Sequence, residues 1–262
     1  MNFEALEIER AGGVATVWMN RPARHNAFNA TLIAELDEAF AGLEADDSLR
    51  VIVLAGRGKS FSAGADLNWM KAAGEASVDE NLADAMRLAR MLERIARCVK
   101  PTVARVHGAA LGGGMGLACA CDICIAGERA VFATSEVKFG IIPAAISPYV
   151  LRTIGERQAY RYFQSAERID ARRAAELGIA HRSVADEALD AALDEQIAAL
   201  LEGGPRSQAA AKALIRAVAH HPVDDALLAD TARRIAELRA TPEAREGLSA
   251  FLDKRPAGWV IQ

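Results

Sequence analysis

The first part of the chain alternates short apolar runs with longer segments of helical periodicity. Two β-type runs, residues 3–10 and 13–20, flank a glycine-containing turn and predict a hairpin. The run 51–56 (VIVLAG) is entirely apolar, which is typical of a parallel strand buried on both faces. Between the hairpin and the run 51–56, residues 31–45 repeat apolar positions at helical spacing. They follow Asn29, a residue suited to cap a helix. This alternation predicts an α/β core.

The same pattern continues to about residue 145 and then becomes helical. We predict a long helix near 78–98, a buried strand over 101–108, and two short strands over 123–127 and 130–135. Beyond them we expect helices over 146–155, 156–166 and 170–178, a brief strand at 181–184, and helices over 186–252 with breaks near 203–205 and 221–222. The predicted division is an α/β core over 1–200 and a helical region over 201–262.

Composition and charge narrow the class of protein. A net charge of −4 gives no overall attraction to nucleic acid or to an anionic membrane. No run approaches the roughly 20 apolar residues that span a bilayer, and the charged start of the chain lacks the apolar segment of a signal peptide. Cys119, Cys121 and Cys124 do not follow a zinc-ligand spacing. We therefore expect a cytoplasmic protein whose site contains no metal.

The stretch GAALGGGMGLACACD (108–122) begins an apparent buried helix on three consecutive glycines. Its spacing does not fit the G-x-G-x-x-G of dinucleotide-binding loops, because the required last glycine falls on Leu117 or Cys119. A phosphate-binding P-loop around Gly58-Lys59-Ser60 fails as well, since position 53 is Val. No serine lies in the G-x-S-x-G pattern of a hydrolase elbow.

Two explanations of the glycine triplet remain open. The first is close packing of the helix against a neighbouring segment. The second is an anion site, because a helix N-terminus presents unpaired N–H groups and partial positive charge. A second glycine-containing loop, GRGKSFSAGADL (56–67), also follows a buried strand. Two such loops, each donating one N–H to the same oxygen, would form an oxyanion hole.

Five motifs in order along the chain resemble the enoyl-CoA hydratase/isomerase (crotonase) superfamily. They are NRPARHNAFN (20–29), GKSFSAGADL (58–67), HGAALGGGMGLACACDI (107–123), SEVKFGIIP (135–143) and FLDKRPAGW (251–259). The resemblance implies an α/β fold, a spiral of β-β-α turns, with a C-terminal helical trimerisation region. It also implies an acyl-CoA substrate, a homotrimer or homohexamer, and no cofactor beyond the coenzyme A carried by the substrate.

The resemblance assigns roles to particular residues. The backbone N–H groups of Ala65 and Gly113 correspond to the pair that holds the thioester oxygen, and Glu136 corresponds to the acid that transfers a proton at the α-carbon. Residues that correspond to the coenzyme A and acyl subsites are Arg24, Ala63, Ala65, Asp66, Leu67, Gly113, Phe251 and Lys254. No residue is assigned to a metal.

One position departs from the pattern of simple hydratases. The resemblance implies that simple hydratases have a second glutamate, which holds the attacking water. In this chain the corresponding position is Gly116. The region after Ile142-Pro143 is more similar to methylglutaconyl-CoA hydratases of branched-chain amino acid degradation. We therefore expect hydration of a 2-enoyl-CoA thioester with a branched acyl group. The alternative is a 3-enoyl to 2-enoyl-CoA isomerase that uses Glu136 alone as its proton shuttle.

A different class of function rests on an arginine stripe. Arg87, Arg90, Arg94 and Arg97 fall on one face of the helix near 78–98 and would suit the phosphates of a nucleic acid. The acidic net charge and Glu93 within the stripe favour a solvated helix face, so nucleic-acid binding is the weakest alternative. His107, which precedes the glycine loop, is interpreted as a core or loop histidine rather than a catalytic base.

Overall fold

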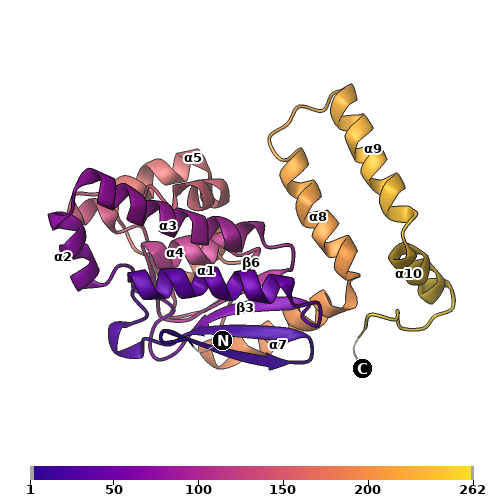
Figure 1. The fold of residues 1–262 in the computed structure, drawn as a ribbon, viewed down its shortest axis with the longest axis horizontal. Coiled ribbons are helices and arrows are strands. Elements are labelled where there is room, and N and C mark those ends of the chain that lie inside the picture. Colours follow the sequence, from indigo (N-terminus) through magenta and orange to yellow (C-terminus); the bar gives the residue numbers. More distant parts are fainter. Residues whose placement is uncertain (1–2, 261–262) are drawn as a thin grey trace. The chain divides into compact units, whose positions relative to one another are not determined.

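The structure, a computed structural model, describes residues 3–260 and divides them into two compact units (Figure 1). The first unit contains the residues up to Cys98 together with Thr102–Asp194. The second contains Val99–Pro101 together with the residues from Glu195 onward.

Two sheets form the framework of the first unit. The larger has the strand order β1-β2-β3-β4-β6-β9, in which β1 and β2 form the predicted antiparallel hairpin and all later neighbours are parallel. The smaller sheet has the order β5-β7-β8. The strands are β1 (Leu6–Ala11), β2 (Val14–Met19), β3 (Val51–Gly56), β4 (Thr102–Val106), β5 (Ala109–Leu111), β6 (Ile123–Gly127), β7 (Val131–Ala133), β8 (Ile169–Asp170) and β9 (Arg182–Val184).

Local capping explains where several helices of this unit begin. Asn29 caps α1 through a bond from the Leu32 N–H, Ser77 and Glu80 form a capping box on α3, and Asp170 caps α6. The helices of the first unit, with the 3-10 turns, are η1 (Pro22–Arg24), α1 (Ala30–Ala45), α2 (Leu67–Glu75), α3 (Val78–Arg97), α4 (Gly113–Ala120), η2 (Glu136–Phe139), α5 (Ser147–Ser165), α6 (Ala171–Glu176) and η3 (Asp186–Ala188); α7 (Leu189–Glu202) begins in this unit.

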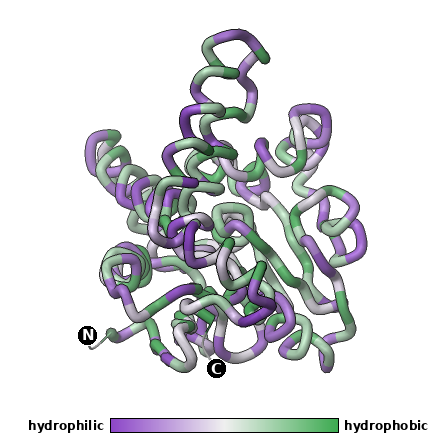
Figure 2. Tube along the Cα trace, turned by 90° about the vertical axis from the view of Figure 1, so that its right-hand side faces the viewer, coloured by the Kyte–Doolittle hydropathy of each residue, from purple (hydrophilic) through white to green (hydrophobic). Residues whose placement is uncertain are grey.

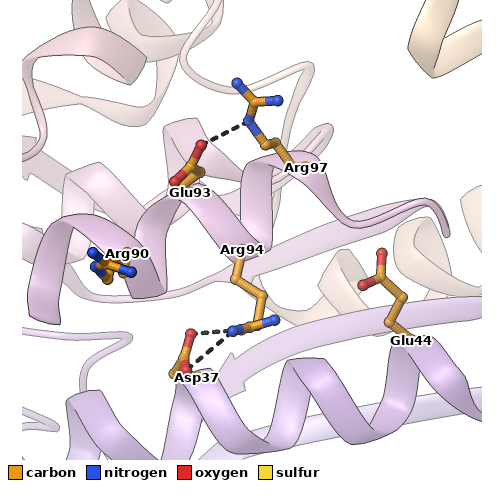
Figure 3. A pocket seen from close by; sticks show the side chains of 6 residues that line it. All are labelled: Asp37, Glu44, Arg90, Glu93, Arg94 and Arg97. Carbon is orange, nitrogen blue, oxygen red and sulfur yellow. Dashed lines mark hydrogen bonds and ion pairs between the residues drawn. The ribbon is translucent and has the colours of Figure 1, made fainter.

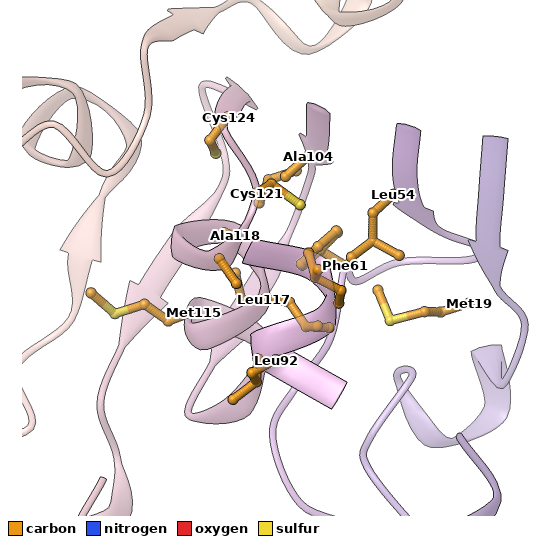
Figure 4. Close-up of a cluster of buried hydrophobic side chains, with 14 of the residues drawn as sticks. Met19, Leu54, Phe61, Leu92, Ala104, Met115, Leu117, Ala118, Cys121 and Cys124 are labelled. Atoms are coloured by element: carbon orange, nitrogen blue, oxygen red, sulfur yellow. The ribbon is translucent and has the colours of Figure 1, made fainter. Parts of the chain in front are cut away.

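Helix α4, which carries the glycine triplet, lies in the middle of the hydrophobic core. Met115, Leu117 and Ala118 are buried, and Phe61 and Leu92 are part of the same cluster (Figure 4). The central strands β3 and β6 are apolar along their length. The helical coils of the chain mostly alternate hydrophilic and hydrophobic residues, as surface helices do (Figure 2). A buried helix fixed on all sides gives its N-terminus a rigid position.

The second unit contains helices with exposed apolar side chains. Its helices are α8 (Pro205–Val218), α9 (Asp225–Arg239) and α10 (Pro242–Leu252), and the predicted breaks at 203–205 and 221–222 lie between helices. Large apolar residues on these helices remain exposed, among them Ile215, Leu228, Ile235, Leu248, Phe251 and Leu252. An apolar surface of this kind is characteristic of a protein–protein contact.

Two details of the predicted pattern change in the structure. Between the predicted glycine-containing loop 56–67 and the helix near 78–98 the structure contains a further helix, α2, which Asp66 caps by accepting a bond from the Asn68 N–H. The helices predicted over 146–155 and 156–166 are continuous in α5 except at Gly155, whose φ of 73° interrupts the helical backbone. Glycine accepts such a φ at little cost, so Gly155, at the predicted boundary between the two helices, produces a kink in one helix.

Candidate active site

The loop after β3 is held by Phe28 on both sides of Ala65. The Phe28 N–H donates to the Gly64 carbonyl at 2.7 Å, and the Asp66 N–H donates to the Phe28 carbonyl at 2.8 Å. The N–H of Ala65 lies between these two bonds and makes no hydrogen bond to another residue of the described chain. An unpaired N–H on a backbone fixed at both neighbours is a suitable donor for a ligand.

The start of α4 presents a second donor of the same kind. Gly112 adopts φ 50° as the N-cap, and its N–H donates to the Ala133 carbonyl at 2.7 Å. Gly113 is the first residue of the helix, so its N–H has no carbonyl one turn earlier to pair with. The helix dipole adds partial positive charge at this end.

The ring of Phe28 packs against the first turn of α4, while its backbone bonds the loop that contains Ala65. A β-carbon placed on Gly113 would lie 2.3 Å from Cε2 of Phe28, and one on Gly114 would lie 2.3 Å from the Ser62 carbonyl oxygen. Gly113 and Gly114 are therefore glycines because the first turn of α4 packs directly against Phe28 and the 56–67 loop. Of the two explanations of the glycine triplet, close packing therefore holds for Gly113 and Gly114, and the anion site stays a prediction.

Glu136 lies beside both glycine segments. A β-carbon on Gly112 would be 3.0 Å from Oε1 of Glu136 and 3.8 Å from Cα of Gly64. Glu136 is the first residue of η2, whose end is capped by Gly140 in a left-handed conformation. The structure thus brings together the 63–65 loop, the 112–114 turn and one carboxyl group, and their roles in a reaction stay predictions.

The environment of Glu136 is suited to proton transfer. Its Oε2 is buried and has no hydrogen-bond partner within the described chain. Burial raises the pKa of the carboxyl above its usual value, partly opposed by a hydrogen bond from its own backbone N–H. A glutamate with a raised pKa exchanges protons more readily near neutral pH than an ordinary surface glutamate.

Ile146 fills the space beside Gly116. Gly116 lies one turn after Gly112 on α4, and a β-carbon placed on it would be 2.2 Å from Cγ2 of Ile146. Ile146 is buried at the start of α5. The position without a carboxylate is therefore occupied by an apolar side chain rather than left open.

The remaining candidates of the first unit differ in their exposure. Asp66 is buried, caps α2 and pairs with Arg21 at 3.0 Å; the hydrogen bond from Arg21 is the main cause that lowers its pKa. Its side chain thus supports the loop. The Ala63 N–H donates to the His25 carbonyl at 2.9 Å. In contrast, Leu67 is 79% exposed, and Arg24 is exposed at the end of η1. Arg24 and Leu67 are free to meet a ligand.

Phe251 and Lys254 lie in the second unit. Phe251 is 80% exposed at the end of α10, and Lys254 follows it with φ 53°. Their roles in binding coenzyme A and the acyl group therefore stay predictions.

The arginine stripe of α3 is largely paired with acidic groups. Arg94 pairs with Asp37 of α1 at 2.5 Å and Arg97 with Glu93 at 2.8 Å, as Figure 3 shows. Arg87 pairs with Asp84 at 2.7 Å. The phosphates of a nucleic acid would have to displace these carboxylates, which argues against the nucleic-acid hypothesis.

Within residues 3–260, no helix is long and apolar enough to cross a membrane. The same residues contain no group of three or more His, Cys, Asp and Glu side chains arranged to hold a metal ion.

Burial raises the pKa of the Cys119 thiol to about 12, so this cysteine is not a thiolate at neutral pH.

Sequence reasoning missed the residues that support the site. Phe28 and Arg21 belong to the quoted motif 20–29, yet the resemblance assigns a role only to Arg24 within it. His25 and Asn26 of this motif have φ values of 50° and 53°, and the Asn26 side chain donates to the carbonyls of Arg57 and Ser60. Asparagine is among the residues that tolerate such φ values, so the His25-Asn26 pair after Pro22 was the available signal of a tight turn at this place.

Comparisons with known proteins identify the family of the chain. The family model described as "Enoyl-CoA hydratase/isomerase" matches residues 9–262. A Thermus thermophilus protein named "Putative enoyl-CoA hydratase" is 37% identical over 255 residues, which cover 96% of this chain and 98% of the relative. The crystal structure of an enoyl-CoA hydratase from Shewanella pealeana superposes with a TM-score of 0.95 at 43% identity, covering 98% of this chain and 96% of that one.

A second structure, from Marinobacter aquaeolei, is named an enoyl-CoA hydratase/isomerase. It superposes with a TM-score of 0.93 at 35% identity and covers 98% of this chain and 99% of its own. The predicted crotonase-type α/β fold is thereby confirmed. The chain belongs to the enoyl-CoA hydratase/isomerase family of enzymes.

Proposed function

We propose that this protein is an enoyl-CoA hydratase that adds water to a 2-enoyl-CoA thioester. The observation that supports it is the approach of three segments to one place: the loop at Ala65, the turn at Gly113 and the carboxyl of Glu136. The unpaired N–H groups would donate to the thioester oxygen, and each such donor contributes about 2.7–4 kcal/mol to transition-state stabilisation in other enzymes.

The chemistry follows from the charges that develop. When water adds to the β-carbon, negative charge moves onto the thioester oxygen, and the two N–H groups stabilise the resulting enolate. As water attacks, the Glu136 carboxylate takes a proton from it, and the carboxylic acid so formed delivers a proton to the α-carbon. Burial raises the pKa of Glu136, which makes it a stronger base toward water than an ordinary surface glutamate.

The Gly116–Ile146 contact supports a second candidate. With an isoleucine where a water-holding acid is missing, the site resembles a one-acid proton shuttle. A 3-enoyl to 2-enoyl-CoA isomerase needs only to remove a proton from C2 and return it to C4. The apolar flank is also suited to a branched acyl group of methylglutaconyl type, which we propose as the substrate class of the hydratase.

The remaining parts of the proposal concern binding and assembly. Arg24 and Lys254 would contact the phosphates of coenzyme A, Ala63, Asp66 and Leu67 would line its path, and Phe251 would close the acyl subsite. The exposed apolar side chains of α8–α10 support a homotrimer or homohexamer.

One experiment separates the two reactions. The protein is incubated with panels of 2-enoyl- and 3-enoyl-CoA thioesters, branched and unbranched, and the products are weighed by mass spectrometry. A hydratase yields a product heavier by one water, whereas an isomerase yields a product of unchanged mass that has moved its double bond. Absence of turnover on every thioester, by a folded protein, would refute both functions.

A further inference from the structure

His107 contacts the 56–67 loop through both its backbone and its ring. Its carbonyl accepts a bond from the Phe61 N–H at 2.9 Å, and its Nε2 lies 2.9 Å from the Gly58 carbonyl oxygen. The loop at this point is packed so closely that a β-carbon on Gly108 would be 2.1 Å from the Lys59 carbonyl oxygen. His107 therefore holds the segment that leads to Ala65.

The partners of the ring determine its tautomer. A carbonyl oxygen only accepts, so Nε2 must carry the hydrogen that points at Gly58. On the other side, Nδ1 lies 3.4 Å from Nη1 of Arg105, and a guanidinium only donates. Nδ1 must therefore be unprotonated, and the ring is neutral.

Arg105 is itself held in place. Its Nε pairs with Asp190 of α7 at 2.6 Å, and its side chain is only 15% exposed. A chain of contacts thus runs from Asp190 through Arg105 and His107 to Gly58 of the loop. These hydrogen bonds end at Gly58, at the start of the loop, so any effect on the reaction must pass through the loop backbone.

We propose that His107, in its neutral Nε2–H form, is a positioning residue that holds the 56–67 loop so that the Ala65 N–H meets the thioester oxygen. This inference rests on the proposed function. Protonation of the ring would place an N–H of Nδ1 against the guanidinium of Arg105 and break the arrangement. Burial and the charge of Arg105 lower the pKa of the ring, whereas the Gly58 carbonyl and the charges of Asp186 of η3 and Asp190 of α7 oppose that shift.

The first test does not depend on activity. The intact protein is labelled with nitrogen-15 in its histidines, and the ring signals of His107 are identified by their absence from the His107→Gln variant. We expect one signal set of a neutral Nε2–H ring at neutral pH. A protonated ring, or the Nδ1–H tautomer, would overturn the proposal.

The second test is kinetic. His107→Leu removes the donor to Gly58, and we expect kcat on the best enoyl-CoA to fall by roughly 3- to 10-fold, the value of about one net hydrogen bond. KM should change little, because the loop acts on the oxygen as charge develops. His107→Gln keeps an N–H at the position of Nε2 and should restore most of kcat, and His221→Leu, on an exposed segment of the second unit, is the control.

The outcomes separate the two proposals. If the wild-type protein turns over no thioester, the proposed function fails, while the ring signals and faster amide exchange of residues 58–65 in His107→Leu still decide whether His107 holds the loop. If the wild type is active and His107→Leu keeps full kcat, the positioning role is wrong. If His107→Leu does not fold, the comparison of His107→Gln with the wild type on acidification decides, because only the wild type should lose the order of residues 58–65 when the ring is protonated.

Discussion

The ring of Phe28 occupies the space that a side chain on Gly113 would need, with Cε2 only 2.3 Å from the position of that β-carbon. The backbone of the same phenylalanine holds Gly64 and Asp66 on either side of Ala65. One residue therefore fixes both the loop and the helix that supply the two proposed N–H donors. The distance between these donors therefore depends on Phe28, a residue to which the resemblance assigns no role.

Substitutions of Gly113 and Phe28, singly and together, test whether the two residues are in contact. Gly113→Ala should destabilise the protein by about 1–3 kcal/mol, the usual cost of overpacking, because the methyl group meets the ring. In Gly113→Ala/Phe28→Leu the smaller side chain relieves the clash, so the double variant should be more stable than the sum of the single changes predicts. Thermal unfolding of the four proteins measures the coupling, and strictly additive effects would contradict the contact.

Replacement of Glu136 by glutamine should abolish most of the activity. The amide in Glu136→Gln keeps the shape of the side chain but cannot exchange the proton, so kcat should fall by about two orders of magnitude or more. Binding of a non-reactive CoA thioester, measured by calorimetry, should change little. A variant that retains most of its kcat would require a different acid.

The same substitution should increase stability at alkaline pH. Because burial raises the pKa of Glu136, the folded state favours the protonated carboxyl, and its contribution to stability is lost as the pH rises from the usual glutamate range through the raised pKa. Glu136→Gln removes this loss, so its melting temperature should exceed that of the wild type at mildly alkaline pH. The difference should disappear in acid, where the wild-type carboxyl is protonated in both states.

Much of the framework could be predicted from periodicity and capping. Asn29 caps α1 as predicted, the helices predicted near 78–98 and over 170–178 begin at Val78 and Ala171, and the apolar run 51–56 is a buried strand. The sequence could not show which distant segments pack against one another. The packing of Phe28 against Gly113 and of Ile146 against Gly116 joins residues far apart in the chain, and no local pattern encodes it.

The proposed coenzyme A contacts can be tested by salt. If Arg24 meets a phosphate, Arg24→Gln should raise the dissociation constant of a CoA thioester by about 1.5- to 5-fold at low salt, as expected for one exposed ion pair. The effect should shrink as salt is added, because exposed charges are screened. Lys254→Gln is expected to act in the same way, and Arg168→Gln, an exposed arginine outside the five motifs, is the control.

The proposed assembly depends on the apolar side chains of the second unit. Static light scattering should report a trimer or hexamer at micromolar concentration. Ile235→Asp places a charge on the exposed apolar surface of α9 and should shift the population toward smaller species without unfolding the helices. A monomeric wild-type protein would contradict the proposal.

The last prediction concerns Gly116 and Ile146. Gly116→Glu alone places a β-carbon 2.2 Å from Cγ2 of Ile146, so the start of α5 must shift, and we expect a loss of stability of about 1–3 kcal/mol. Removing the obstructing side chain in Gly116→Glu/Ile146→Gly makes room for the new glutamate. The double variant should melt at a higher temperature than Ile146→Gly, whose cavity costs about 2–5 kcal/mol.

The activity of the double variant then distinguishes the two candidate reactions. The resemblance places the missing acid at position 116, so a carboxylate there is expected to hold water if this position faces the reacting carbons. Hydration of an unbranched 2-enoyl-CoA should therefore rise relative to the wild type if the native enzyme is a hydratase of branched substrates. If the native reaction is isomerisation, hydration should appear where there was none, and isomerisation should fall because both reactions compete for the same enolate. A folded double variant with unchanged rates on every thioester would show that position 116 faces away from the reacting carbons.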